Sequence, residues 1–276
     1  MRLWKELEAG GKIALFDASD ADVILRSSDD VSFKVYRKDL EAYSDGFVGP
    51  PSSIDEVEVV QLTETSRVLE LLLQFMRRQR QPSFKDVDFN VLDGLAEAAE
   101  KYEVFSATEP CKIWMSAAAS SHPVEVLSYA MKHDYTELAN QCAVHTIGLD
   151  VDSTLKRLPP NAQLPWLRYC YKWHNVVPDL LRYKNPIQCR RKSPPDGPPC
   201  ALWSEFYARV AEKFARGGLK VLQPGEIGSV FRIAEETTGI EDCPKCVLRT
   251  RFKMAGSRRA VGPAAKIHQI HHFVVA

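Results

Sequence analysis

The sequence FKVYRKDLEAYSDGF at residues 33–47 is the stretch from which the fold can be inferred. Apolar and polar residues alternate over 31–35, and this period of two predicts a β-strand. The spacing then changes, because Leu40, Ser44 and Phe47 recur three or four residues apart, as they would on one face of a helix. The stretch therefore predicts a strand that runs directly into a short amphipathic helix.

Further strands are predicted on both sides of this stretch. Residues 21–26 (ADVILR) are an apolar run rich in β-branched side chains, and 27–30 (SSDD) provide a turn, so a hairpin is expected. A loop rich in Pro and Ser follows at 48–56 (VGPPSSIDE). The alternation in 57–62 (VEVVQL) then predicts a third strand.

Helices are predicted after the third strand. Thr65 can cap a helix with a wide apolar stripe, and Pro82 breaks the helical pattern that follows. Asp88 precedes a second helix, and a third is expected near 111–115. This order of strands and helices predicts an α+β domain in which a small sheet is covered by helices.

The order and spacing of these residues over 17–118 resemble a BTB/POZ domain, in the divergent form found in BTB proteins of mushroom-forming fungi. In that family an Asp precedes the first strand, and the pattern His-x-x-x-Leu-x-x-x-Ser-x-x-Phe joins a strand to a helix. Tyr36 stands here in place of the usual His, and a later Leu-Ala-x-x-Ala-x-Lys-Tyr pattern is matched at 95–102. The residues that carry the resemblance, called the BTB signature residues below, are Asp22, Tyr36, Leu40, Ser44, Phe47, Leu95 and Tyr102.

The resemblance implies a protein-interaction module whose BTB signature residues mostly pack in the core. Some family members are substrate adaptors of cullin-type ubiquitin ligases and carry an apolar-x-Glu motif before the third strand. Ile54 and Glu56 fit that motif and are candidate partner-binding residues, although a chance loop sequence would look the same. Many members form homodimers through a long N-terminal extension. Only a short segment precedes the first strand here, which leaves a homodimer open.

An all-α helical extension is predicted over 121–242, with a Pro-rich loop near 185–200. Apolar positions of the helices in 91–115 recur 31 or 32 residues later in 123–146, as two stacked helical hairpins would produce. This pair of hairpins resembles the BACK-like extensions of BTB proteins.

An aromatic-rich segment at 165–174 (PWLRYCYKWH) predicts one short helix within this extension. Its aromatic and basic side chains could stack on nucleic-acid bases, but burial of the aromatic rings in a helical core is the favoured interpretation. Two further helices are expected at 202–214 and 226–236.

Cys243 and Cys246 form a Cys-x-x-Cys pair, the one metal-like spacing in the chain. A tetrahedral zinc site needs two more ligands, for which Cys189 and Cys200 are the candidates. Ordinary reduced cysteines without a metal are the alternative. Thioredoxin-like chemistry is disfavoured because no βαβ pattern surrounds the pair.

A basic tail that we expect to be disordered occupies 243–276, with seven Lys or Arg residues and no Asp or Glu. It supports an alternative function as a transcription- or nucleic-acid-linked regulator. A solvated tail or a localisation signal would have the same composition. The net charge of zero gives the whole chain no field that would attract nucleic acid, so binding to nucleic acid is the less favoured interpretation.

The sequence does not indicate an enzyme. It contains no nucleophile elbow, phosphate-binding loop, dinucleotide fingerprint or zinc-protease motif, so we expect no small-molecule substrate and no cofactor other than zinc. A hydrophobic content of 45% indicates a folded core, yet no apolar run is long enough to span a membrane. The charged N-terminus is unlike a signal peptide, and the odd cysteine count is unlike a disulfide framework. We therefore expect an intracellular protein of the cytoplasm or nucleus.

Overall fold

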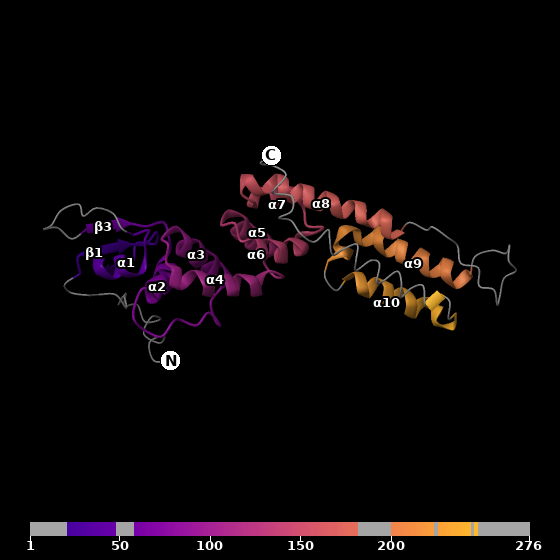
Figure 1. Ribbon diagram of the computed structural model, residues 1–276, viewed down its shortest axis with the longest axis horizontal. Helices are drawn as coiled ribbons and strands as arrows, with labels where there is room; N and C mark the ends of the chain where they lie inside the picture. Colours follow the sequence, from indigo (N-terminus) through magenta and orange to yellow (C-terminus); the bar gives the residue numbers. More distant parts are fainter. Residues whose placement is uncertain (1–20, 48–57, 182–199, 224–225, 244–245, 248–276) are drawn as a thin grey trace. The chain divides into compact units, whose positions relative to one another are not determined.

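The computed structural model describes residues 21–47, 58–181, 200–223, 226–243 and 246–247 of the 276-residue chain. The chain divides into two compact units, 1–118 and 119–276, each described here by itself. The first unit holds a small sheet with helices, and the second is helical throughout its described residues (Figure 1). The α+β class predicted from the sequence is confirmed.

The sheet of the first unit has three strands in the order β2-β1-β3. β1 (Val23–Arg26) and β2 (Ser32–Val35) form the predicted antiparallel hairpin. β3 (Glu58–Gln61) lies on the other side of β1 and runs parallel to it. A parallel neighbour requires the chain to cross over before it re-enters the sheet, and α1 (Arg37–Tyr43) begins that crossover directly after β2.

Three longer helices complete the first unit: α2 (Ser66–Phe75), α3 (Phe89–Lys101) and α4 (Phe105–Ala118). Their inner faces follow the helical spacing seen in the sequence, and Leu69, Leu72 and Leu95 are fully buried. Because each such side chain contributes roughly 1.5–3 kcal/mol when it leaves water, burial of these faces is a main source of this unit's stability.

A side chain from the β1–β2 turn caps α2. Asp29 accepts hydrogen bonds from the backbone N–H of Ser66 (2.7 Å) and from the Ser66 hydroxyl (2.6 Å). Thr65 occupies the N-cap position, as predicted, but its own side chain makes no capping hydrogen bond. The hairpin turn therefore fixes the start of α2 against the sheet.

The second unit is built from six α-helices and three short 3₁₀ segments within its described residues. In chain order they are α5 (Pro123–Lys132), α6 (Thr136–Ala143), η1 (Val144–Thr146), α7 (Val151–Arg157), α8 (Pro160–Leu181), α9 (Ala201–Gly217), η2 (Gly218–Leu222), α10 (Glu226–Thr238) and η3 (Ile240–Asp242).

Two contacts join the early and late helices of this unit. The side-chain amide of Gln223, after η2, donates hydrogen bonds to the carbonyls of His145 (3.2 Å) and Ile147 (2.8 Å). Gly148 has φ +76° and approaches η2 so closely that a Cβ would lie 2.7 Å from the backbone nitrogen of Lys220. A residue with a side chain would be both strained and obstructed there.

The aromatic segment at 165–174 lies within a longer helix than the sequence predicted. α8 begins at Pro160, so Pro165 stands inside the helix rather than at its start. Trp166, Tyr169 and Trp173 are at most 1% exposed, which confirms the core interpretation and excludes base stacking by these rings. The favourable free energy of burying these rings offsets the loss of the backbone hydrogen bond that a proline removes from a helix. No helix in the described part of the chain is long and apolar enough to cross a membrane.

Candidate functional site

Several BTB signature residues meet at one point of the first unit. The Ser44 hydroxyl donates a 2.5 Å hydrogen bond to the carbonyl oxygen of Tyr102 and accepts one from the backbone N–H of Phe47 (3.1 Å). The rings of Phe47 and Tyr102 stack with their centroids 4.1 Å apart. Gly46 also donates to the Tyr102 carbonyl (3.0 Å), and a Cβ on Gly46 would lie 2.6 Å from the Tyr102 backbone. The end of α1 is thus fastened to the end of α3.

A charged group extends this contact toward β3. Glu64 accepts hydrogen bonds from Lys101 (2.9 Å) and from the Tyr102 hydroxyl (2.7 Å). Burial raises the pKa of the Glu64 carboxyl, but its hydrogen bonds, those with Lys101 and Tyr102 foremost, together outweigh burial, so its pKa is lowered overall. Burial raises the pKa of Tyr102 to about 12, which keeps the phenol neutral as a hydrogen-bond donor. We call Ser44, Phe47, Glu64, Lys101 and Tyr102 the α1–α3 clasp.

The two remaining polar signature residues lie where α1 begins. The Asp22 carboxylate accepts a 2.7 Å hydrogen bond from the backbone N–H of Arg37, the first residue of α1. Arg37 also forms an ion pair with Glu58 at the start of β3. Tyr36 is the N-cap residue of α1 but makes no capping hydrogen bond through its side chain. Asp22 therefore joins the start of β1 to the start of α1.

The partner-binding residues predicted from the sequence, Ile54 and Glu56, lie outside the described residues. The same holds for the basic tail from 248 onward. Both interpretations therefore remain predictions.

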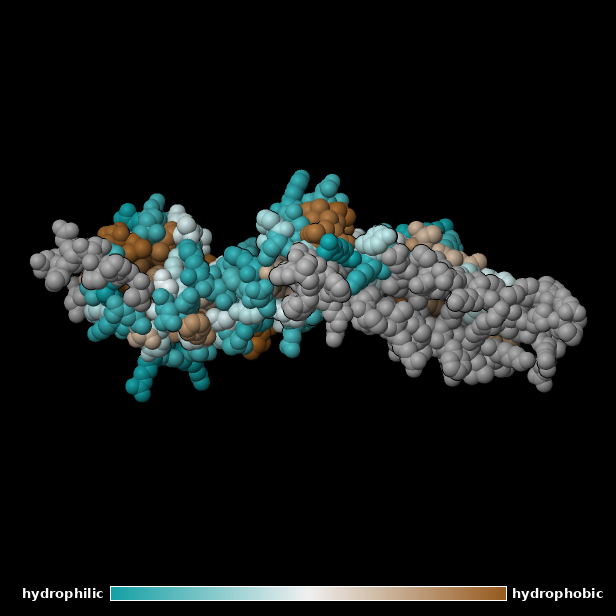
Figure 2. Space-filling view, turned by 45° about the horizontal axis from the view of Figure 1, so that its top comes forward, coloured by the Kyte–Doolittle hydropathy of each residue, from teal (hydrophilic) through white to brown (hydrophobic). Residues whose placement is uncertain are grey.

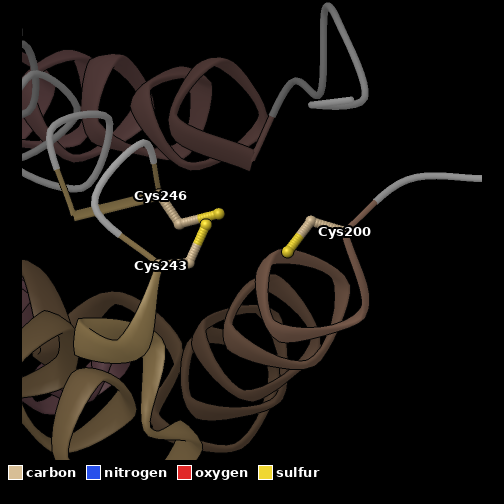
Figure 3. A group of neighbouring side chains, drawn as sticks. All are labelled: Cys200, Cys243 and Cys246. Atoms are coloured by element: carbon tan, nitrogen blue, oxygen red, sulfur yellow. The ribbon is translucent and has the colours of Figure 1, made fainter. Parts of the chain in front are cut away.

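Three of the four cysteines predicted as metal ligands come together in the second unit. The Sγ atoms of Cys200, Cys243 and Cys246 all lie within 4.8 Å of one another. Figure 3 shows the Cys243 and Cys246 side chains side by side, with the Cys200 sulfur directed toward them from the start of α9. We call these three residues the cysteine cluster. Cys189 lies outside the described residues.

Local backbone structure explains how the cysteine cluster forms. Cys243 follows η3, and its carbonyl accepts hydrogen bonds from the N–H groups of Cys246 (2.9 Å) and Val247 (3.1 Å). This turn places the Cys243 and Cys246 thiols on the same side. Cys246 is fully buried. Ordered packing therefore continues past Asp242, where the sequence predicted that the tail begins.

The cysteine cluster differs from the other described cysteines. Cys111, Cys142 and Cys170 each stand apart from it, and burial raises the pKa of each thiol to about 12. Such thiols behave as small apolar side chains. Among the described residues, only the cysteine cluster gathers three groups able to hold a metal ion.

Sequence reasoning missed an exposed apolar stripe on α8, formed by Leu164, Leu167 and Tyr171. These residues are 49%, 38% and 68% exposed and recur three and four residues apart, on a different side of the helix from the buried aromatic residues. Figure 2 shows hydrophobic surface on both units. In the first unit, Val59 of β3 (57%) and Ile113 of α4 (66%) are exposed. The three- and four-residue spacing within 164–171 could have indicated this stripe, but the apolar residues of the buried face alternate with it in the sequence.

The chain matches no protein-family model, and a search of curated proteins finds no significant match.

Proposed function

We propose that the protein is a non-enzymatic interaction module of the BTB type, in which the first unit binds another protein. One observation carries the proposal. The sheet order β2-β1-β3, with α1 entered directly from β2, brings Ser44, Phe47 and Tyr102 into direct contact. The sequence singled out these three residues for their resemblance to a BTB pattern. Their convergence in space gives that pattern a physical reason, because each takes part in the contact between the end of α1 and the end of α3.

Exposed apolar side chains support binding to protein rather than to a small molecule. Val59 and Ile113 in the first unit, and the α8 stripe in the second, are more exposed than core residues of their type would be. The three residues of the α8 stripe are neighbours on one side of the helix, and contiguous exposed apolar surface usually marks an interaction site.

The proposal can be tested by affinity purification of the full chain, with partners identified by quantitative mass spectrometry. Two surface variants, Val59→Asp and Ile113→Asp, replace exposed apolar side chains without opening the core. We expect at least one protein to be enriched with the wild type and lost with one of these variants. Ser28→Asp, at an exposed position of the β1–β2 turn, adds the same negative charge to the same unit and is the control. No reproducible enrichment, together with a monomer at all concentrations in light scattering, would contradict the proposal.

A narrower form of the proposal is that the partner is a cullin scaffold, which makes the protein a ubiquitin-ligase adaptor. It rests on the resemblance and on Ile54 and Glu56. Purified chain and purified cullin N-terminal domains should bind saturably in calorimetry, and the double variant Ile54→Arg, Glu56→Lys should abolish binding. Leu164→Arg places a charge on the exposed stripe of the second unit and should leave binding unchanged. Absence of binding by the wild type would reject the adaptor role while leaving the wider proposal to the affinity purification.

A further inference from the structure

The cysteine cluster joins two segments of the second unit that are distant in sequence. Cys200 precedes α9 as its N-cap residue, whereas Cys243 and Cys246 flank a turn after η3. Their three sulfur atoms lie within 4.8 Å of one another (Figure 3). Chance proximity of two thiols is common in a folded protein, but three thiols converging from two segments require a more specific explanation.

The spacing of these sulfurs is close to that of a zinc–thiolate centre. Zinc–sulfur bonds of about 2.3 Å in a tetrahedron place the sulfurs about 3.8 Å apart. The sulfurs of the cysteine cluster need to approach one another by no more than about 1 Å, which small side-chain rotations can provide. The Cys-x-x-Cys turn is already formed by the hydrogen bonds to the Cys243 carbonyl.

The electrostatic surroundings also suit such a centre. Three thiolates around Zn²⁺ carry a net negative charge, and a helix N-terminus carries partial positive charge. Cys200 stands at the N-terminus of α9, whose first turn contains no acidic residue. Soft thiolate ligands favour zinc over magnesium or calcium, which prefer oxygen.

We propose that Cys200, Cys243 and Cys246 bind a structural zinc ion that ties the start of α9 to the segment after η3. We assign the ion a structural role because Cys246 is fully buried and the three ligands cross-link two segments of the unit. Zinc completes its tetrahedron with a fourth ligand from outside this group, and the proposal does not depend on its identity. The site is independent of the interaction function proposed for the first unit.

Zinc would act on the stability of the second unit. A metal that binds the folded state and not the unfolded chain adds its binding free energy to folding. The ion would cross-link the start of α9 to the turn after η3, two segments that are distant in sequence. Removing zinc should therefore lower the unfolding temperature of the second unit while leaving the first unit unaffected.

The test measures metal content of the full chain, produced with zinc and purified under reducing conditions without a chelator. Elemental analysis should find about one zinc ion per chain. Cys200→Ser should lose it while keeping its helical circular dichroism, because Ser is a good N-cap residue. Cys243→Ser provides a second variant on the other segment. Cys170→Ser, a partly buried thiol of α8 outside the cysteine cluster, is the matched control and should keep its zinc.

A second measurement separates zinc binding from simple thiol packing. A strong chelator should lower the unfolding temperature of the wild type and of Cys170→Ser, but not that of Cys200→Ser. Cobalt substituted for zinc should give the visible absorption of a tetrahedral thiolate complex in the wild type. The two cluster variants, Cys200→Ser and Cys243→Ser, should not show this absorption. Wild-type protein without zinc after exposure to stoichiometric metal, equal zinc in Cys200→Ser, or iron in place of zinc would each overturn the proposal.

Discussion

The Ser44 hydroxyl donates a 2.5 Å hydrogen bond to the Tyr102 carbonyl, between residues that are 58 positions apart in the chain. Tyr102 ends α3, and its carbonyl has no partner within the helix beyond that point, so the hydroxyl satisfies a buried polar group. The same hydroxyl accepts the N–H of Phe47, which turns the chain after α1. The Ser44 side chain thus provides hydrogen-bond partners for two backbone groups in the α1–α3 clasp.

Ser44→Ala should destabilise the first unit by about 1–2 kcal/mol, because the Phe47 N–H and part of the Tyr102 carbonyl lose their partner in a buried site. Hydrogen–deuterium exchange should increase at the ends of α1 and α3 but not in the second unit. Ser28→Ala, an exposed serine in the β1–β2 turn, is the control and should change the free energy of unfolding by less than about 0.5 kcal/mol. Unchanged exchange around residue 102 would show that the hydrogen bond contributes nothing.

Glu64→Gln should destabilise the first unit in a pH-dependent manner. Burial raises the pKa of Glu64 but its hydrogen bonds from Lys101 and Tyr102 lower it further, below the ordinary value of 4.5. A lowered folded-state pKa contributes stability that is full above 4.5 and is lost as the pH falls through the lowered pKa. The difference between wild type and Glu64→Gln should therefore be largest near neutral pH and shrink in acid.

The measurement is denaturant unfolding of wild type and Glu64→Gln across the pH range. Hydrogen–deuterium exchange of amides in the first unit reports which unit unfolds. Glu41→Gln, which changes an exposed carboxyl of the same unit to an amide, is the matched control. A constant difference between wild type and Glu64→Gln from neutral pH into acid would show that the clasp does not depend on the Glu64 charge.

The local parts of the fold could be predicted because their signals are local. Alternation at 31–35 and helical spacing at 65–76 depend on neighbouring residues, and both elements form where expected. Glu64 was not singled out, because its partners Lys101 and Tyr102 become neighbours only when α3 packs beside the end of β3. The meeting of distant residues is a property of packing and leaves no periodic signal in the chain.

The candidate metal ligands show the same difference between what local sequence predicts and what only packing brings together. The Cys-x-x-Cys spacing pointed to Cys243 and Cys246 from the sequence, since a turn of that length places two thiols together. Cys200 is one of two distant candidates that the sequence offers, with Cys189, and its position beside the pair comes from the packing of α9 against η3. The sequence predicts a helix shorter than α8 because a proline at 165 is typical of the first turn of a helix, whereas α8 begins at Pro160.

Asp29→Ala should destabilise the first unit by about 1 kcal/mol through loss of the cap on α2. Hydrogen bonds from Ser27 and Ser66 lower the pKa of Asp29 from 3.8 to about 2, so its contribution is full above pH 3.8 and is lost as the pH falls toward 2. Thermal unfolding at neutral pH should detect the effect. Asp45→Ala removes an exposed carboxyl after α1 and is the control. Equal unfolding temperatures for the two variants would contradict a capping role.

Gly148→Ala should destabilise the second unit by about 1–3 kcal/mol, because the residue has φ +76° and its Cβ would lie 2.7 Å from the Lys220 backbone. The substitution should also weaken the adjoining hydrogen bonds from Gln223 to His145 and Ile147, since η2 must move away to make room. Hydrogen exchange should therefore increase at both η1 and η2. Gly228→Ala is the matched control, because a Cβ at this position of α10 meets nothing within 4 Å. Alanine favours a helix over glycine by roughly 0.5–1 kcal/mol, so Gly228→Ala should stabilise the protein, and an effect of the same sign at both glycines would contradict the close approach of η2.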